Sequence, residues 1–226
     1  MRFKFLALLL IFVAGACKST VKNDVASMNE DGFQSLWNGR DLSGWIYGKA
    51  GAGFNKSGEG YRVRDGVLYC TANDGGNLFT EKEYSNFIFR FEFKLSENAN
   101  NGLGIRAPLE GDAAYDGMEI QILDDWGSKY RNLQPWQYHG SIYHVFPAIR
   151  GALRPAGEWN EQEVVANGTK IKVVLNGKTI VDADLANVKD PETLQKHPGL
   201  FRKQGHIGFL GHGAHVEFRG MRIREL

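Results

Sequence analysis

The chain has 226 residues, of which 42% are hydrophobic and 23% are charged, a composition that is ordinary for a globular protein. Its 27 Lys and Arg residues nearly balance its 26 Asp and Glu residues, so the formal net charge is only +1. This balance gives no reason to expect a nucleic acid as partner. Two cysteines cannot hold a chain of this length together, so its hydrophobic core must do so.

The N-terminal segment predicts a targeting signal. A basic start is followed by an apolar run that is too short to span a bilayer permanently, as in a signal peptide. Small residues then precede Cys17, as in a bacterial lipobox, which predicts that Cys17 is lipidated. We expect a signal peptide over residues 1–16, a polar lipid-anchored tether over 17–30 and a single domain over 31–226. The expected location is the cell envelope, in the periplasm or at the outer membrane, with the lipid as the only membrane contact.

Residues 87–95 show the clearest period-two alternation in the chain. Four phenylalanines and a leucine fall on one face of the predicted strand, and Arg90, Glu92 and Lys94 fall on the other. A strand with one apolar and one polar face is typical of an antiparallel sheet that covers a core on one side.

Turn and cap signals place further elements along the chain. Asn176-Gly177 predicts a two-residue hairpin between two strands, and Asp190-Pro191 predicts the start of one short helix. Residues 206–210 and 214–223 are expected to form a final pair of strands. Many short strands without regularly alternating helices favour an all-β sandwich.

The strand predicted over residues 118–123 carries the most informative polar residues. Its apolar side chains fall on one face, Glu119 and Gln121 fall on the other, and Asp124 follows at its end. Glycanases built on curved β-sandwiches carry carboxylates in this pattern, about 5–5.5 Å apart when they retain configuration. Gln121 cannot relay protons to a nucleophile, which disfavours a retaining glycanase. The alternative interpretation is a solvated strand face beside an acidic loop.

Further candidates for substrate binding lie on other strands and in an aromatic-rich segment. If the phenylalanine-rich strand neighbours the strand just described, Glu92 would help to line a charged groove, and Arg106 would contact a ligand or an acid. Trp126, Trp136 and Tyr143 lie in a segment crowded with aromatic residues, whose rings could stack on sugar C–H faces. The alternatives are ordinary surface polarity and hydrophobic packing under a long loop.

Two histidines are candidates for proton transfer. His139 and His212 each precede a glycine in a loop at a strand end, where either could act as a general base or serve only as a turn residue. No local pair of residues has the spacing of a metal motif, so the sequence predicts no metal and no other cofactor.

A series of short motifs resembles one known family. The motif FQSLWNGRDLSGW opens the domain at residues 33–45, and GFLGHG lies near its end at residues 208–213. The motifs between them are VRDGVL at 63–68, YSNF at 84–87, NGLGIR at 101–106, EIQILD at 119–124, PAGEWN at 155–160 and LNG at 175–177. In this order they resemble the 3-keto-disaccharide hydrolase family, with 3-keto-glucoside 1,2-lyase and 3-keto-2-hydroxy-glucal hydratase activities. The resemblance covers residues 31–226.

The resemblance implies a concanavalin A-like jelly-roll β-sandwich of two curved antiparallel sheets, with a sugar ligand and extracytoplasmic use. It also implies elimination from a 3-keto-glucoside followed by hydration, a net hydrolysis on the concave face. Such a site needs a base, a donor to an oxyanion and an acid. The candidates are Glu119 or His139 as base, Arg106 or Gln121 as oxyanion donor, and Asp124 or His212 as acid.

Two other functions remain open from the sequence. A non-catalytic carbohydrate-binding module would use the same aromatic segment and polar face to bind an oligosaccharide. An ordinary retaining glucanase is the third interpretation, and Gln121 disfavours it.

Overall fold

The computed structural model describes residues 32–49, 59–72 and 75–226. The predicted signal peptide, tether and lipidated Cys17 lie outside the described residues. No helix in the described part of the chain is long and apolar enough to cross a bilayer.

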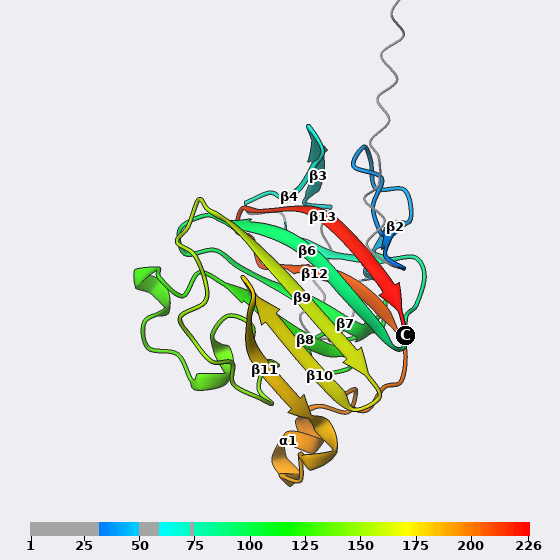
Figure 1. Cartoon of the computed structure of the whole chain (residues 1–226), viewed down its shortest axis with the longest axis vertical. Coiled ribbons are helices and arrows are strands. Elements are labelled where there is room, and N and C mark those ends of the chain that lie inside the picture. Colours follow the sequence, from blue (N-terminus) through cyan, green and yellow to red (C-terminus); the bar gives the residue numbers. More distant parts are fainter. Residues whose placement is uncertain (1–31, 50–58, 73–74) are drawn as a thin grey trace, which may run out of the picture. The chain divides into compact units, whose positions relative to one another are not determined.

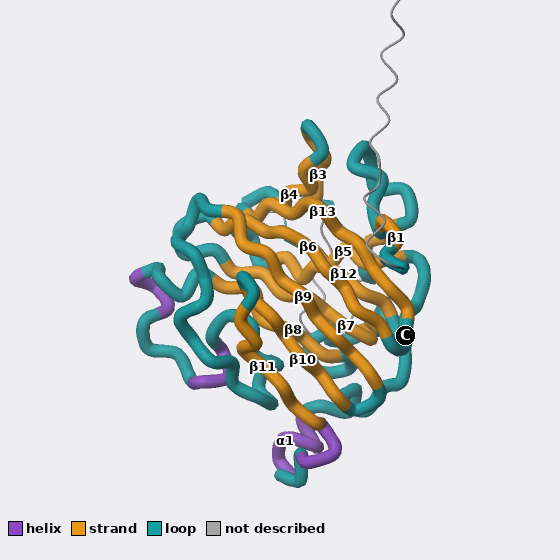
Figure 2. The backbone as a smooth tube through the Cα atoms, viewed as in Figure 1, coloured by secondary structure: helices purple, strands orange, loops and turns teal. Residues whose placement is uncertain are grey.

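The described residues form two antiparallel sheets, and helical segments are few and lie outside the strand layers (Figures 1 and 2). The larger sheet has the strand order β11-β10-β9-β6-β13-β4-β3, with β1 paired to β13, and the smaller has the order β2-β5-β12-β7-β8. This architecture confirms the predicted concanavalin A-like sandwich.

The strands of the larger sheet are β1 (Gln34–Ser35), β3 (Tyr61–Arg64), β4 (Val67–Cys70), β6 (Phe87–Leu95), β9 (Trp159–Asn167), β10 (Lys170–Leu175), β11 (Lys178–Asp184) and β13 (Val216–Glu225). Those of the smaller sheet are β2 (Trp45–Tyr47), β5 (Gly76–Thr80), β7 (Asn100–Ala107), β8 (Met118–Leu123) and β12 (His206–Gly211). The helical segments are α1 (Pro191–Lys196) and the short 3₁₀ helices η1 (Ser128–Tyr130), η2 (Pro135–Gln137) and η3 (Leu185–Asn187).

The core lies between the two sheets. The alternation predicted for β6 is confirmed, because its phenylalanines are fully buried while the residues between them are half-buried. Phe91 meets Phe209 of the smaller sheet with ring centroids 5.7 Å apart, and Phe209 stacks on Phe218 of the larger sheet at 3.8 Å. Aromatic contacts of this kind bury large apolar areas and join the two layers.

Local turn and cap predictions are also confirmed. Asn176 and Gly177 both have positive φ, 49° and 79°, and join β10 to β11 as the tight hairpin turn requires. The Asp190 side chain accepts a hydrogen bond from the backbone N–H of Thr193 and so caps α1, which begins at Pro191.

The two strands predicted near the end of the chain are present, but their predicted pairing with each other is wrong. β12 lies in the smaller sheet between β5 and β7, whereas β13 lies in the larger sheet between β6 and β4. The connecting segment, which contains His212, therefore crosses from one layer to the other. The strand lengths were predictable from alternation, but their partners depend on contacts far away in the sequence.

Candidate functional site

Glu119 and Gln121 lie on the outer face of the smaller sheet, the face that points away from the core. Met118, Ile120 and Ile122 fill the core on the other side of β8. Contrary to the predicted solvated face, Glu119 and Gln121 are only 4% and 5% exposed.

The cover over β8 comes from a segment that runs along its edge. The backbone N–H of Gly140 donates to the carbonyl of Gln121 at 2.8 Å, and that of Tyr143 donates to the carbonyl of Glu119 at 2.9 Å. Ile142, between them, pairs with Ile120 in an isolated bridge and is fully buried. The segment therefore extends the sheet and brings Tyr143 beside Glu119.

The Glu119 carboxylate lacks the hydrogen bonds that a buried acid normally has. Its Oε1 atom is buried without a hydrogen-bond partner among the described residues. The imidazole Nε2 of His212 lies 3.8 Å from this oxygen, beyond hydrogen-bond range but close enough for attraction when the ring is protonated. A buried oxygen without a partner is energetically costly, so its retention indicates a role beyond stability.

Glycine gives Glu119 the space that its side chain occupies. A Cβ atom on Gly102 of the neighbouring strand β7 would lie 2.0 Å from Glu119 Oε1, closer than any real contact. Gly104, paired directly with Glu119, has its nearest neighbour at 3.2 Å in the flexible end of the Leu210 side chain. Gly102 is therefore the position that lets the carboxylate lie flat over the sheet.

Two tyrosines stand beside Glu119. The rings of Tyr115 and Tyr143 meet edge to face at 6.3 Å, and their side chains are hydrogen-bonded. Burial, with smaller contributions from Tyr143, Asp112 and Glu119, raises the pKa of Tyr115 to about 12. Tyr115 therefore keeps its proton at neutral pH and remains a hydrogen-bond donor.

Two imidazoles and an indole continue this cluster. The ring of His197 lies 4.7 Å from that of Tyr115, and the ring of His144 lies 5.1 Å from that of Trp136. Burial is the main reason that the pKa of His197 falls to about 4, so this ring is neutral at pH 7. We call Glu119, Tyr115, Tyr143, His144, His197, Trp136 and His212 the Glu119 cluster.

Missing hydrogen bonds concentrate in this cluster. Five buried side-chain polar atoms in the described part of the chain have no hydrogen-bond partner, and three of them are Glu119 Oε1, Trp136 Nε1 and His197 Nε2. Buried polar groups are normally satisfied, so three exceptions in one neighbourhood favour a site for a polar ligand or ordered water.

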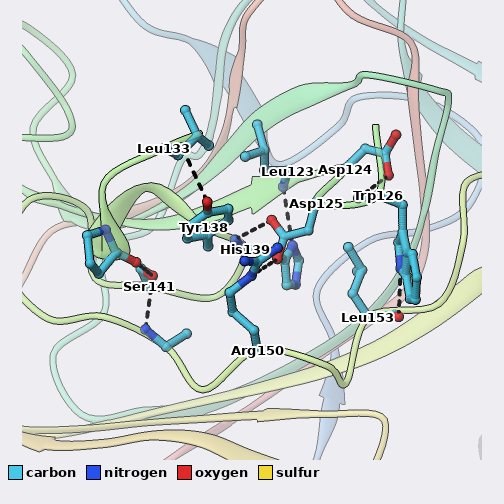
Figure 3. Close-up of polar contacts among 12 residues, drawn as sticks. Leu123, Asp124, Asp125, Trp126, Leu133, Tyr138, His139, Ser141, Arg150 and Leu153 are labelled. Carbon is cyan, nitrogen blue, oxygen red and sulfur yellow. Dashed lines mark hydrogen bonds and ion pairs between the residues drawn. The ribbon is translucent and has the colours of Figure 1, made fainter. Parts of the chain in front are cut away.

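His139, a predicted general base, lies instead inside the core. Its ring stacks on Phe93 at 5.0 Å, and its Nε2 meets Gln162 Oε1 at 3.0 Å. Its Nδ1 accepts from the backbone N–H of Leu123 (Figure 3). Nδ1 is thus unprotonated and Nε2 carries the proton. Burial lowers the pKa of His139 to about 4, so this histidine is a neutral structural residue and its prediction as a base is wrong.

The Asp124 carboxylate likewise has a structural role, because both of its oxygens accept hydrogen bonds from backbone N–H groups near the end of β8. One carboxylate oxygen accepts from the backbone N–H of Asn98 at 2.8 Å, and the other accepts from that of Trp126 at 3.2 Å. It is 1% exposed. The structure therefore does not place Asp124 as a free acid beside Glu119, because its oxygens hold the end of β8 in shape.

Glu92 and Arg106 also differ from their predicted positions. Glu92 lies on the outer face of the larger sheet, on the opposite side of the sandwich from Glu119. The prediction that Glu92 helps to line a groove shared with Glu119 is therefore wrong. The Arg106 guanidinium donates to the carbonyls of Ser85, Gly168 and Arg202 and to Asn86. Arg106 ties loops together at the end of β7, where its φ of 49° breaks the strand alternation.

The aromatic candidates separate into two places. Tyr143 and Trp136 belong to the Glu119 cluster. Trp126 lies beyond the end of β8, where its indole N–H donates to the carbonyl of Leu153 (Figure 3). Of the predicted site residues, the structure thus brings Glu119, Gln121, His212, Tyr143 and Trp136 to one side of the smaller sheet.

Sequence reasoning missed Tyr115, His144 and His197 as members of the cluster. Tyr115 lies four residues before Glu119, but no periodic pattern continues through that turn. His144 and His197 are far apart in the sequence and carry no local motif, so only the fold could join them. Among residues of the described ranges, no three His, Cys, Asp or Glu side chains are arranged to hold a metal ion.

The fold and the cluster define a β-sandwich protein with a buried carboxylate, an imidazole and aromatic rings on one sheet, a chemistry suited to sugars. A family model described as a 3-keto-alpha-glucoside-1,2-lyase-like domain matches residues 32–224. The chain belongs to this family.

Individual relatives agree with this placement. The chain is 23% identical over 240 residues to a 3-keto-disaccharide hydrolase of Bacteroides thetaiotaomicron, covering 88% of this chain and 80% of that protein. A crystal structure of a candidate glycosyl hydrolase from Parabacteroides distasonis is 26% identical, covers 86% of this chain and 99% of its own, and superposes with a TM-score of 0.72. An endo-beta-1,3(4)-glucanase of family GH16 shares the fold at 12% identity, with a TM-score of 0.53 and coverage of 85% and 91%.

Proposed function

We propose that this protein is a glycoside-processing enzyme that acts on 3-keto-glucosides by elimination followed by hydration. Family membership and the name of the Bacteroides relative support the substrate class. The observation that carries the proposal is the buried, partnerless Glu119 Oε1 with His212 Nε2 at 3.8 Å. A carboxylate oxygen that no protein group occupies is available to take a proton from a substrate.

The ketone at C3 of such a sugar acidifies the proton on C2. Glu119 removes this proton, and the electron pair moves to the C3 oxygen as an enolate. When the enolate collapses, the bond from C1 to the glycosidic oxygen breaks and His212 protonates the leaving oxygen. The first products are the free alcohol and a 3-keto-2-hydroxy-glucal with a double bond between C1 and C2.

Hydration then reverses the proton movements. Water adds its hydroxyl to C1, His212 accepts the water proton, and Glu119 returns a proton to C2. The sum is hydrolysis of the glycosidic bond. In both halves Glu119 handles the proton on C2 and His212 handles the proton on oxygen, which matches two groups held close together on one face.

The enolate oxygen needs a hydrogen-bond donor. Gln121 lies on the same face as Glu119, and its Oε1 accepts from the backbone N–H of Ile122 at 3.1 Å, which leaves its amide N–H groups to donate. The hydrogen-bonded hydroxyls of Tyr115 and Tyr143 supply a second donor, because one O–H of the pair is not used in the bond between them. Preorganised donors at a developing oxyanion are a major source of rate enhancement in enzymes.

The test is turnover of 4-nitrophenyl 3-keto-β-glucoside in D₂O. Elimination and hydration predict release of nitrophenol and deuterium at C2 of the product, measured by NMR and corrected for exchange without enzyme. Direct displacement at C1 would release nitrophenol without deuterium at C2 and would contradict the mechanism. Retention on immobilised glycan without any turnover would support a non-catalytic binding module instead.

We also propose that the mature protein is attached to the cell envelope through a lipid on Cys17, as the small residues before it indicate. Cys17→Ser should move the protein from the membrane fraction to the soluble fraction on cell lysis, as followed by immunoblotting. Unchanged fractionation would contradict the lipid anchor and would leave the proposed reaction untouched.

A further inference from the structure

Trp126 is a large aromatic side chain that is exposed yet held in place. Trp126 is 61% exposed. Its indole N–H donates to the carbonyl of Leu153 at 3.1 Å, and its backbone N–H donates to Asp124 at 3.2 Å (Figure 3). An exposed indole usually has free side-chain rotation, whereas these two hydrogen bonds restrict the rotation of this one and leave most of the residue exposed.

A cavity of about 300 Å³ lies against this ring, which is at the lower end of the range of small-molecule sites. Asp125, Trp126, Arg150, Gly151 and Leu153 line it. The cavity thus combines one aromatic plane with one carboxylate and one guanidinium.

The two charged groups are themselves held by the fold. Asp125 accepts from the backbone N–H of His139 at 3.0 Å, and the Arg150 guanidinium lies over the ring of Tyr138 at 3.7 Å. Arg150 Nε lies 3.7 Å from Asp125 Oδ2, longer than a direct hydrogen bond. The two groups form an ion pair, but a guanidinium has five N–H donors and a carboxylate has about four acceptor positions, so each keeps hydrogen-bonding capacity for a ligand.

This combination matches a pyranose ring. The apolar C–H face of a sugar packs on an aromatic plane, and two neighbouring hydroxyls can donate to a carboxylate and accept from a guanidinium. A gluco-configured ring presents the flattest C–H face because its hydroxyls are equatorial. A flat hydrophobic docking surface for a protein would not need a fixed carboxylate and a fixed guanidinium in a cavity.

The site is separate from the Glu119 cluster. Leu123, at the end of β8, is four residues after Glu119, which is about 13 Å along the strand, and Trp126 lies beyond that end. Its contacts are to the segment that contains Arg150 and Leu153, whereas Glu119 contacts His212.

We propose that the cavity beside Trp126 is a second, non-catalytic binding site for a gluco-configured glycosyl unit, which would hold an oligosaccharide at the end of β8. It does not depend on the reaction proposed for Glu119.

The experiment measures binding of cellotetraose to the full chain by intrinsic tryptophan fluorescence and by calorimetry. Wild type should bind, and Trp126→Ala should weaken binding at least about tenfold, the change that ~1.4 kcal/mol produces. Trp126→Phe should retain part of the affinity, and Arg150→Gln should lower it, while melting temperatures report whether each variant is folded. Methyl β-galactoside, whose axial hydroxyl interrupts the flat face, should bind more weakly than methyl β-glucoside.

Two controls keep the outcome specific. Phe201→Ala removes another exposed aromatic residue, 50% exposed, and should leave cellotetraose binding unchanged. Glu119→Gln should also leave it unchanged, so a failure of the proposed reaction and a failure of this site are distinguishable. No binding by wild type, or equal binding by wild type and folded Trp126→Ala, would overturn the proposal. Capture of a protein rather than a glycan by this surface would overturn it as well.

Discussion

The two outer faces of the sandwich both carry glutamates, but these glutamates differ in burial and in charged partners. On the outer face of the larger sheet, charged residues of β6 are matched by opposite charges on the neighbouring strands. The pairs are Arg90 with Glu163 at 2.6 Å, Glu92 with Arg219 at 2.6 Å and Lys94 with Glu217 at 2.7 Å. Their side chains are between about a fifth and two fifths exposed, so water screens each pair.

On the outer face of the smaller sheet, Glu119 is almost completely buried and its Oε1 has no hydrogen-bond partner in the described part of the chain. Among the described residues, the basic group within 4 Å of it is His212, which is charged only when protonated. The comparison teaches that a glutamate on a strand face is not by itself a sign of catalysis. Glu92 is neutralised by its neighbours, whereas Glu119 is buried at a cost that stability alone does not explain.

Exchanging each glutamate for its amide tests this contrast most directly. Glu119→Gln keeps the shape of the side chain but removes the base, so turnover of a 3-keto-glucoside should fall ~10²–10⁴-fold. Glu92→Gln is the matched control and should change turnover little and stability by about 0–1 kcal/mol, as for an exposed ion pair. Equal turnover by wild type and folded Glu119→Gln would remove Glu119 from the reaction.

Substitutions in the core between the two sheets should destabilise the protein far more than substitutions on either outer face. Phe91 is fully buried and touches the rings of Phe89, Phe93, Phe209 and Phe218. Phe91→Ala should lower the free energy of unfolding by about 3–5 kcal/mol through lost contacts and a cavity, measured by urea denaturation. Phe91→Leu fills more of the space and should cost less. A loss no larger than that of Glu92→Gln would contradict the burial of this ring between the sheets.

The buried His139 should make the stability of the fold depend on pH. The pKa of His139 is about 4 in the folded protein because of burial, compared with 6.5 for an ordinary histidine. Between these values the unfolded chain binds a proton that folded His139 does not, so stability should fall as pH decreases from about 6.5 to about 4. The full contribution is about 3 kcal/mol.

Urea denaturation as a function of pH checks this expectation. His139→Gln should flatten the dependence in that range, although His197, whose pKa is also about 4, should preserve part of it. A variant with the same pH dependence as wild type would show that His139 is not buried as a neutral ring. His212→Gln should lower turnover of a 3-keto-glucoside, because this residue is the proposed acid.

Gly102→Ala tests the placement of Glu119 without changing the carboxylate. The added methyl group would lie 2.0 Å from Glu119 Oε1, so the Glu119 side chain must move. A displacement of about 1 Å can reduce turnover ~10²-fold. Gly104→Ala, on the same face of the same strand, has its closest contact at 3.2 Å with the end of the Leu210 side chain and should reduce turnover less. Equal effects of the two substitutions would contradict the role of Gly102.

Local patterns in the sequence determined the strands, turns and caps. The alternation in residues 87–95 follows from side chains that point to opposite faces of a strand, and it needs no knowledge of the partner strands. The turn at Asn176-Gly177 and the cap at Asp190 depend on backbone geometry within a few residues. These features therefore appear in the structure as predicted.

The tertiary structure alone decided which polar strand face belongs to the site. Glu92 and Glu119 occupy equivalent places in alternating strands, but β6 and β8 belong to different sheets, so their polar faces point in opposite directions. His139 and His212 each precede a glycine, yet the His139 ring packs in the core and the His212 ring lies beside Glu119. Sheet assignment arises from pairing between segments far apart in the chain, and period-two patterns carry no information about it.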